Sequence, residues 1–255
     1  MGLWGLWGYK SQKSQISQKS QKSQGPQIFM IRLQNISKTY PREIEVLHDI
    51  SLDIAAGEFV SLVGQSGTGK TTLVKILIGE EKVDSGKVLI GDWDITDISQ
   101  REVPYLRRQI GVIFQDFKLL TKKTLAENVA FALQVCGQPQ EKINKIVPTV
   151  LRIVGLEDKA HRYPNEVSGG EQQRTAIARA LVHQPKILLA DEPTGNLDSI
   201  NAHEIIDLLQ RINSFGTTVV LVTHNREIVN NLRKRVIMID GGRVVSDQEL
   251  GKYVL

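Results

Sequence analysis

The chain carries a glycine-rich stretch, Gly64 to Thr71, that constrains its fold more than any other feature. The stretch reads Gly-Gln-Ser-Gly-Thr-Gly-Lys-Thr and fits the phosphate-binding pattern G-x-x-x-x-G-K-S/T. A short apolar run at 59–63 precedes it, and the residues at 71–78 are predicted to form a helix. This is the strand–loop–helix context that the pattern requires, so we expect an α/β fold built around a phosphate site.

Each part of this stretch has a physical role toward a phosphate group. The glycines let the backbone curl so that several N–H groups point at one anion, and the following helix directs its positive end to the same point. Lys70 adds a cation for the outer phosphates, and the Thr71 hydroxyl can bind Mg²⁺. The residues predicted here to bind ATP are Gly64, Gln65, Ser66, Gly67, Thr68, Gly69, Lys70, Thr71 and Thr72.

Four positions each follow an apolar strand directly: Gly64, Gln115, the pair Asp191–Glu192, and His224. Open parallel sheets bind ligands at the carboxyl ends of their strands, so we expect these residues to share one site. Asp191 is predicted to hold Mg²⁺ with Thr71 and Gln115, because oxygen ligands suit this ion. Glu192 is predicted to act as the general base on the attacking water.

His224 is predicted to orient groups near the γ-phosphate, with capping of the helix 225–231 as the alternative role. Gln115 offers its amide oxygen to Mg²⁺ or to the water. The other histidines, His48, His161, His183 and His203, are interpreted as surface residues. Tyr40 is either a platform for the adenine or an ordinary exposed turn residue.

The stretch Ser168-Gly169-Gly170 predicts a second cradle for an anion. Ser168 can cap the following helix, and two glycines leave its first N–H groups accessible. Because the first cradle already binds ATP, we expect head-to-tail pairing, in which each Ser168 cradle closes over the ATP of a partner copy. Such a homodimer has two-fold symmetry.

The distribution of strands and helices changes along the chain. Early strands at 31–36, 46–54 and 87–91 have no helices between them and predict a small antiparallel sheet. Later apolar strands at 110–114, 186–190, 217–223 and 236–239 alternate with helices, which predicts a parallel sheet covered on both faces. A helical block is expected at about 116–166, with helices at 124–136 and 141–154, and two further helices follow it, one from Ser168 to about Val182 and one at 200–214.

The net charge of +4 does not indicate a nucleic-acid-binding surface. Residues 1–29 hold four lysines and no acidic residue, so the remainder is neutral. Residues 1–29, with a Ser-Gln-x repeat, are interpreted as a disordered tail, with a membrane tether or a true start at Met30 as alternatives. The single cysteine, Cys136, and the lack of an apolar run of roughly 18–20 residues predict a cytoplasmic protein that meets a membrane only through a partner.

Taken together, these motifs resemble the ABC-type ATPase subunits. The resemblance covers about 30–255 and includes Val-Ser-Gly-Gly-Glu-Gln-Gln-Arg at 167–174, Ile-Leu-Leu-Ala-Asp-Glu-Pro-Thr at 187–194, Asn196-Leu197-Asp198 and Thr223-His224. Val167 replaces the leucine usual in the family. The resemblance implies a P-loop, RecA-like core with an antiparallel β-subdomain and an inserted helical subdomain, and ATP sites between two subunits.

The segments at 114–120, 127–133 and 189–198 are similar to the cell-division branch of that family, which acts with the membrane protein FtsX. This implies control of cell-wall hydrolases; export or lipoprotein release is the alternative, because these near relatives share the catalytic residues. We expect Phe117, Leu119 and Leu120, with the helix from Thr124, to dock the membrane partner or, alternatively, to pack inside the helical subdomain.

Overall fold

The computed structural model describes residues 28–41 and 44–253. The predicted tail therefore lies outside the described residues, apart from its last two positions. Phe29 begins the first strand, and the carbonyl of Ile28 accepts a hydrogen bond from the Ala56 N–H at 2.9 Å. The first strand thus begins slightly before the expected boundary at residue 30.

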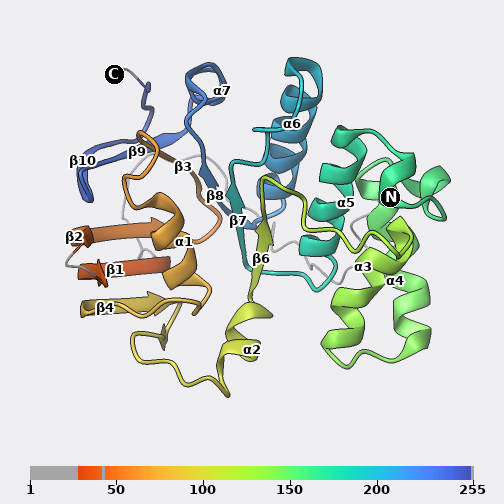
Figure 1. Ribbon diagram of the computed structural model, residues 1–255, viewed down its shortest axis with the longest axis horizontal. Coiled ribbons are helices and arrows are strands. Elements are labelled where there is room, and N and C mark those ends of the chain that lie inside the picture. The colour runs from red at the N-terminus through yellow and green to blue at the C-terminus, as the bar shows by residue number, and fades with distance from the viewer. Residues whose placement is uncertain (1–27, 42–43, 254–255) are drawn as a thin grey trace, which may run out of the picture.

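A six-stranded sheet forms the centre of the molecule (Figure 1), in the order β10-β9-β3-β8-β7-β6. Strands β6, β7, β8, β3 and β9 are parallel, and β10 pairs antiparallel with β9 at the edge. The strands are β3 (Phe59–Val63), β6 (Ile110–Ile113), β7 (Ile187–Asp191), β8 (Thr218–Val222), β9 (Arg235–Asp240) and β10 (Arg243–Gln248).

A second, antiparallel sheet lies to one side, in the order β2-β1-β4-β5. Its strands are β1 (Phe29–Tyr40), β2 (Ile44–Ala55), β4 (Ser85–Ile90) and β5 (Trp93–Asp94). The expected antiparallel β-subdomain is therefore confirmed. Its first two strands are longer than predicted, because hydrogen-bonded pairing continues through polar residues such as Lys38 and Thr39, which carry no apolar signal.

The helices lie on both faces of the central sheet: in Figure 1, α3, α4, α5 and α6 lie on the side away from the antiparallel sheet, whereas α1 lies beside that sheet. They are α1 (Lys70–Leu77), α2 (Val103–Arg107), α3 (Leu125–Val135), α4 (Gln140–Ile153), α5 (Gly169–Leu181), α6 (Ser199–Ser214) and α7 (Arg226–Leu232). Short 3₁₀ helices span Glu157–Lys159 and Pro164–Glu166.

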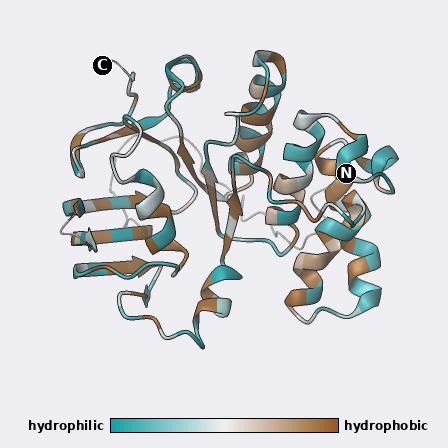
Figure 2. Cartoon of the chain, viewed as in Figure 1, coloured by the Kyte–Doolittle hydropathy of each residue, from teal (hydrophilic) through white to brown (hydrophobic). Residues whose placement is uncertain are grey.

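Alternate residues of the central strands enter two different cores, because successive side chains point to opposite faces of a sheet. In β7, Leu188 and Ala190 pack with α3, α5 and α6, whereas Ile187 and Leu189 pack with α1 and the antiparallel sheet. Figure 2 shows this concentration of hydrophobic residues along the central strands. Burial on both faces explains why these strands are almost wholly apolar and were predictable.

Candidate functional site

The pairing of the strands brings the predicted site residues to one edge of the sheet. Ile113 of β6 lies opposite Ala190 of β7, and Asp191 lies opposite Val222 of β8. Val222 also lies opposite Leu62 of β3. Neighbouring strands therefore end at the same level of the sheet, and these strand ends are followed by Gln115, Asp191–Glu192, His224 and the glycine-rich loop.

The glycine-rich loop connects β3 directly to α1, and its shape depends on Gly69. Gly69 caps α1 with φ 97°, and a Cβ there would lie 2.7 Å from the carbonyl oxygen of Val46. A larger residue would thus be strained and would also clash. The Lys70 ammonium donates to the carbonyls of Gly64 (2.9 Å) and Gln65 (2.6 Å) and contacts the Thr68 hydroxyl (3.3 Å).

Buried Lys70 and half-buried Asp191 and Glu192, of opposite charge, face one another across the site. Burial raises the pKa of Asp191, and nearby Glu192 raises it further, while a hydrogen bond from Thr71 and the charge of Lys70 act in the opposite direction. Burial lowers the pKa of Lys70, against the pull of Glu192 and Asp191. A cation close to Asp191 would relieve both the burial cost and the repulsion from Glu192.

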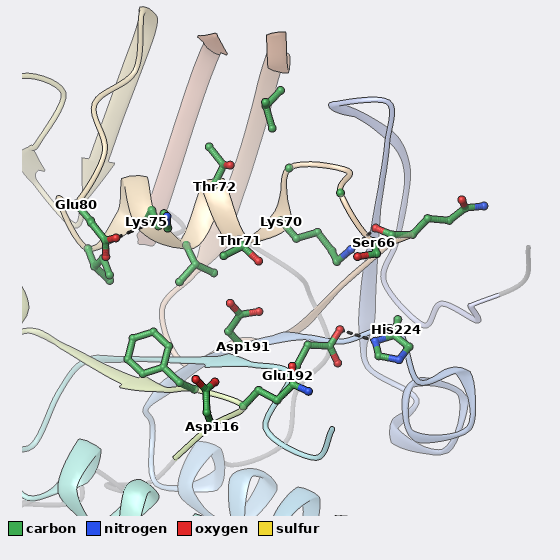
Figure 3. A pocket seen from close by; sticks show the side chains of 18 of the residues that line it. Ser66, Lys70, Thr71, Thr72, Lys75, Glu80, Asp116, Asp191, Glu192 and His224 are labelled. Carbon is green, nitrogen blue, oxygen red and sulfur yellow. Dashed lines mark hydrogen bonds and ion pairs between the residues drawn. The ribbon is translucent and has the colours of Figure 1, made fainter. Parts of the chain in front are cut away.

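Glu192 and His224 contact each other directly in the site. The Glu192 carboxylate lies 2.7 Å from His224 Nδ1 and accepts a longer bond from the Thr223 hydroxyl at 3.3 Å. Glu192 adopts φ 49°, a left-handed conformation that is uncommon for a non-glycine residue. Figure 3 shows Asp191, Glu192 and His224 on one side of the pocket, facing Lys70 and Thr71.

Gln115 lines the same pocket and is held through Asn196. The Asn196 amide donates to the Gln115 carbonyl at 3.0 Å, and the two side-chain amides lie 3.4 Å apart. Asn196 lies in the loop after β7, so it links the Gln115 segment to the Asp191–Glu192 segment.

A pocket of about 970 Å³ joins these groups, at the upper end of the size range of small-molecule sites. The predicted residues that line it are Gln65, Ser66, Gly67, Gly69, Lys70, Thr71, Thr72, Gln115, Asp191, Glu192 and His224. Gly64 and Thr68 contribute through their contacts with Lys70. Tyr40 does not line the pocket, and its ring centre lies 5.5 Å from the ammonium of Lys38 in the same strand.

Several lining residues were not identified from the sequence, among them Val46, Arg226 and Tyr253. Val46 lies in β2, and Tyr253 follows β10, so only the folded chain brings them to the loop. Tyr253 is 3% exposed and packs against Val63, which directly precedes the glycine-rich loop. No local pattern could have identified these contacts.

Ser168 and its glycines lie outside this pocket, at the start of α5. Ser168 and Glu171 form a reciprocal capping box, with the Glu171 N–H donating to the Ser168 hydroxyl at 3.3 Å. A Cβ on Gly170 would overlap the side chain of Asn201, so the glycine permits close packing of α5 on α6. The Ser168 hydroxyl is therefore used within its own helix cap.

The interpretation of the other histidines is wrong in part. His161 and His203 are exposed, but His183 is half-buried, and its buried Nε2 has no hydrogen-bond partner among the described residues. Burial lowers the pKa of His183, which favours the neutral ring. His48 is half-buried and contacts Glu45 at 2.9 Å. The apolar patterns did not indicate this burial, because a histidine carries no apolar signal of its own.

The comparisons with known proteins agree with this geometry. A family model described as ABC transporter matches residues 47–195. The chain belongs to the ABC transporter family, and it is an ATP-binding and ATP-hydrolysing member of that family, as expected. It is 50% identical to the cell division ATP-binding protein FtsE of Bacillus subtilis, over 88% of this chain and 98% of that protein.

Other relatives and solved structures extend this result. FtsE of Mycobacterium tuberculosis is 49% identical over 88% of this chain and 98% of its own length. The methionine import ATP-binding protein MetN of Carboxydothermus hydrogenoformans is 43% identical over 86% of this chain and 66% of its own length. A dimeric, post-hydrolysis ATP-binding cassette bound to ADP and Pi superposes with a TM-score of 0.79 at 37% identity, covering 88% of this chain and all of that one. CbiO1 of Clostridium perfringens superposes with a TM-score of 0.81 at 30% identity, covering 87% and 88%.

No helix within 28–41 and 44–253 has both the length and the hydrophobicity needed to cross a bilayer.

Proposed function

We propose that this chain is the ATPase subunit of a membrane complex in bacterial cell division. Two copies close on ATP and transmit the closure to an integral membrane partner of the FtsX type, which controls cell-wall hydrolases. The observation that carries the proposal is the 50% identity to FtsE across 98% of that protein. The chain reaches the inner face of the membrane through this partner.

The alternative is an ATPase subunit of a transport system. MetN relatives support it, but the match covers only 66% of the MetN chain, whereas it covers nearly all of each FtsE chain. The chain thus matches FtsE in extent as well as identity, which favours the division role.

The pocket fits ATP with Mg²⁺. The loop 64–72 would hold the phosphates, with Lys70 on the outer ones. The Thr71 hydroxyl, the Asp191 carboxylate and the Gln115 amide form the set of hard oxygen ligands that Mg²⁺ prefers. Mg²⁺ would neutralise phosphate charge. Tyr40 or Val46 would lie against the adenine, and Val46 is favoured because it lines the pocket.

Glu192 is proposed as the general base on the attacking water. Its contact with His224 holds the carboxylate at one edge of the pocket. Ser168, Gly169 and Gly170 are proposed to close over the ATP of the partner subunit. Their place outside their own pocket supports this arrangement.

The docking surface for the membrane partner is proposed at the start of the helical subdomain, about 116–166. Leu120 and Phe131 are 36% and 40% exposed, so both apolar side chains are accessible to a partner. Phe117 and Leu119 are half-buried, so they fit the alternative of internal packing better than docking. Leu120 is therefore the better position at which to test docking.

Leu120→Asp should abolish co-purification with the membrane partner, because a charge would be desolvated at the interface. Thermal stability and ATP binding should remain near those of the parent. Lys122→Asp, two residues away, is the matched control. The phenotype then decides the role: filamentous cells support division, whereas normal division with defective lipoprotein release or substrate transport supports the alternative. An intact complex in Leu120→Asp cells that divide normally would refute this docking surface.

A further inference from the structure

The segment that follows β10 returns to α7 and to the rim of the ATP pocket, where it places Tyr253 (Figure 1). Tyr253 is buried, although it lies outside every helix and strand. Leu250, three residues earlier in the same segment, is 80% exposed. The segment as a whole is therefore not enclosed, and the burial belongs to Tyr253 itself.

Tyr253 covers one face of α7 through three contacts. Its ring centre lies 5.6 Å from the guanidinium carbon of Arg226, and its side chain packs with Val229. Its backbone N–H donates to the side-chain oxygen of Asn230 at 2.8 Å. Residues three and four positions apart share a face of a helix, so these contacts hold α7 along a single face.

This cover matters because α7 has only seven residues, and so short a helix is not stable on its own. Ile228 and Leu232 of α7 pack into the large core on the helical side of the central sheet. Val229 belongs instead to a small separate cluster with Tyr253 and Val63. Val63 directly precedes the glycine-rich loop, so Tyr253 lies between α7 and the strand that carries this loop.

The position of α7 determines where His224 lies. Asn225 caps α7, accepting from the Ile228 N–H at 3.1 Å, and its own N–H donates to the buried Thr223 hydroxyl at 3.1 Å. The His224 side chain is 69% exposed, so little packing holds the ring itself. Its contact with Glu192 at 2.7 Å therefore depends on the backbone at the start of α7.

We propose that Tyr253 is a positioning residue for ATP hydrolysis. It holds α7 against the end of β3 and thereby keeps His224 in contact with Glu192. Tyr253 acts through His224 and not through contact with the nucleotide. This inference rests on the proposed role of Glu192 as the general base, and it adds a residue from the segment after the last strand to the residues that hydrolysis depends on.

Steady-state kinetics of the full chain test the role of Tyr253. Tyr253→Ala should lower kcat about ten- to a hundredfold, because displacing a positioned group by about 1 Å can cost about that much. Its KM for ATP should stay near that of the parent, since Lys70 and the glycine-rich loop are unchanged. Tyr253→Phe keeps the ring and should restore kcat. Leu250→Ala is the matched control in the same exposed segment and should behave as the parent.

A double-mutant cycle with His224→Ala separates positioning from a general loss of stability. If Tyr253 acts through His224, adding Tyr253→Ala to His224→Ala should lower kcat no further, because the two substitutions remove the same interaction. Single-turnover reactions with excess protein measure the low rates of these variants. Losses that multiply in the double variant would overturn the positioning role and leave the role of His224 intact.

The remaining outcomes are equally decisive. A parent kcat in folded Tyr253→Ala, or a raised KM with an unchanged kcat, would overturn the inference. Hydrolysis by His224→Ala at the parent rate would refute the proposed Glu192–His224 arrangement together with it. If a melting curve shows that Tyr253→Ala does not fold, Asn230→Ala is measured instead, since it removes the acceptor of the Tyr253 N–H. It must lower kcat at an unchanged KM and add nothing to His224→Ala, and a parent kcat there would overturn the positioning role.

Discussion

Lys70, Asp191 and Glu192 show how much of the site depends on single side chains. All three could be predicted from the sequence, because the glycine-rich pattern and an apolar strand ending in two acids are local signals. Val46 and Tyr253 could not, because they reach the pocket only through tertiary packing. The two carboxylates differ in their surroundings: burial raises the pKa of Asp191, whereas Glu192 is held by its contact with His224.

Glu192→Gln should retain ATP binding, because Gln keeps the shape of Glu192 while removing its basicity. Hydrolysis should fall by about 10²–10⁴-fold, the usual scale for losing a general base. The variant should accumulate as an ATP-bound dimer, detected by size-exclusion chromatography. Hydrolysis at the parent rate would show that another group takes the proton.

Asp191→Asn should raise the stability of the nucleotide-free protein at neutral pH. The folded-state pKa of Asp191 is raised from 3.8, so the folded protein binds more protons than the unfolded chain between 3.8 and that higher pKa. Stability contributed by Asp191 therefore falls as pH rises through this window and stays low above it. The melting temperature of Asp191→Asn should exceed that of the parent at pH 7, and the difference should shrink toward about pH 4. A constant difference across this range would contradict the assignment.

At the scale of elements, buried parallel strands were predicted well and polar or short elements were not. β7 and β8 are apolar along almost their whole length because both their faces are covered. β10 alternates exposed and half-buried positions at a sheet edge, and α2 has five residues, so neither gives a strong periodic signal. α4 contains Pro148, which is exposed, and the helix continues through it.

Asn128 of α3 is the clearest element-scale contact that no pattern revealed. It is fully buried and binds the Leu120 N–H and carbonyl at 2.7 and 3.1 Å, and the Lys123 and Thr124 carbonyls at 3.0 and 2.9 Å. This single amide shapes the loop that leads to the proposed docking surface.

Asn128→Ala should lower the free energy of unfolding by about 2–4 kcal/mol, because several partly buried backbone groups lose their partner, at up to about 1–3 kcal/mol each. Urea denaturation measures this. Asn144→Ala on the exposed side of α4 is the control and should change stability by less than about 0.5 kcal/mol. Equal effects of the two substitutions would mean that the Asn128 amide does not organise the loop.

At the scale of the whole molecule, the two stretches predicted to bind anions do not share a pocket within one chain. The glycine-rich loop lines the ATP pocket, and Ser168–Gly170 lie outside it at the start of α5. The sequence predicted both cradles from local patterns. The separation of the two stretches followed only from the argument that ATP already occupies the first, which leaves the second for the ATP of a partner copy.

Counting trapped ATP in mixed dimers tests the central claim most directly. Lys70→Ala and Ser168→Arg proteins, each also carrying Glu192→Gln, are mixed, and the ATP retained per dimer is measured. The trans arrangement predicts little trapped ATP in either protein alone and one ATP per mixed dimer, because one intact Lys70 then meets one intact Ser168. Mixed dimers that trap no more ATP than the separate proteins would contradict a site shared between two subunits.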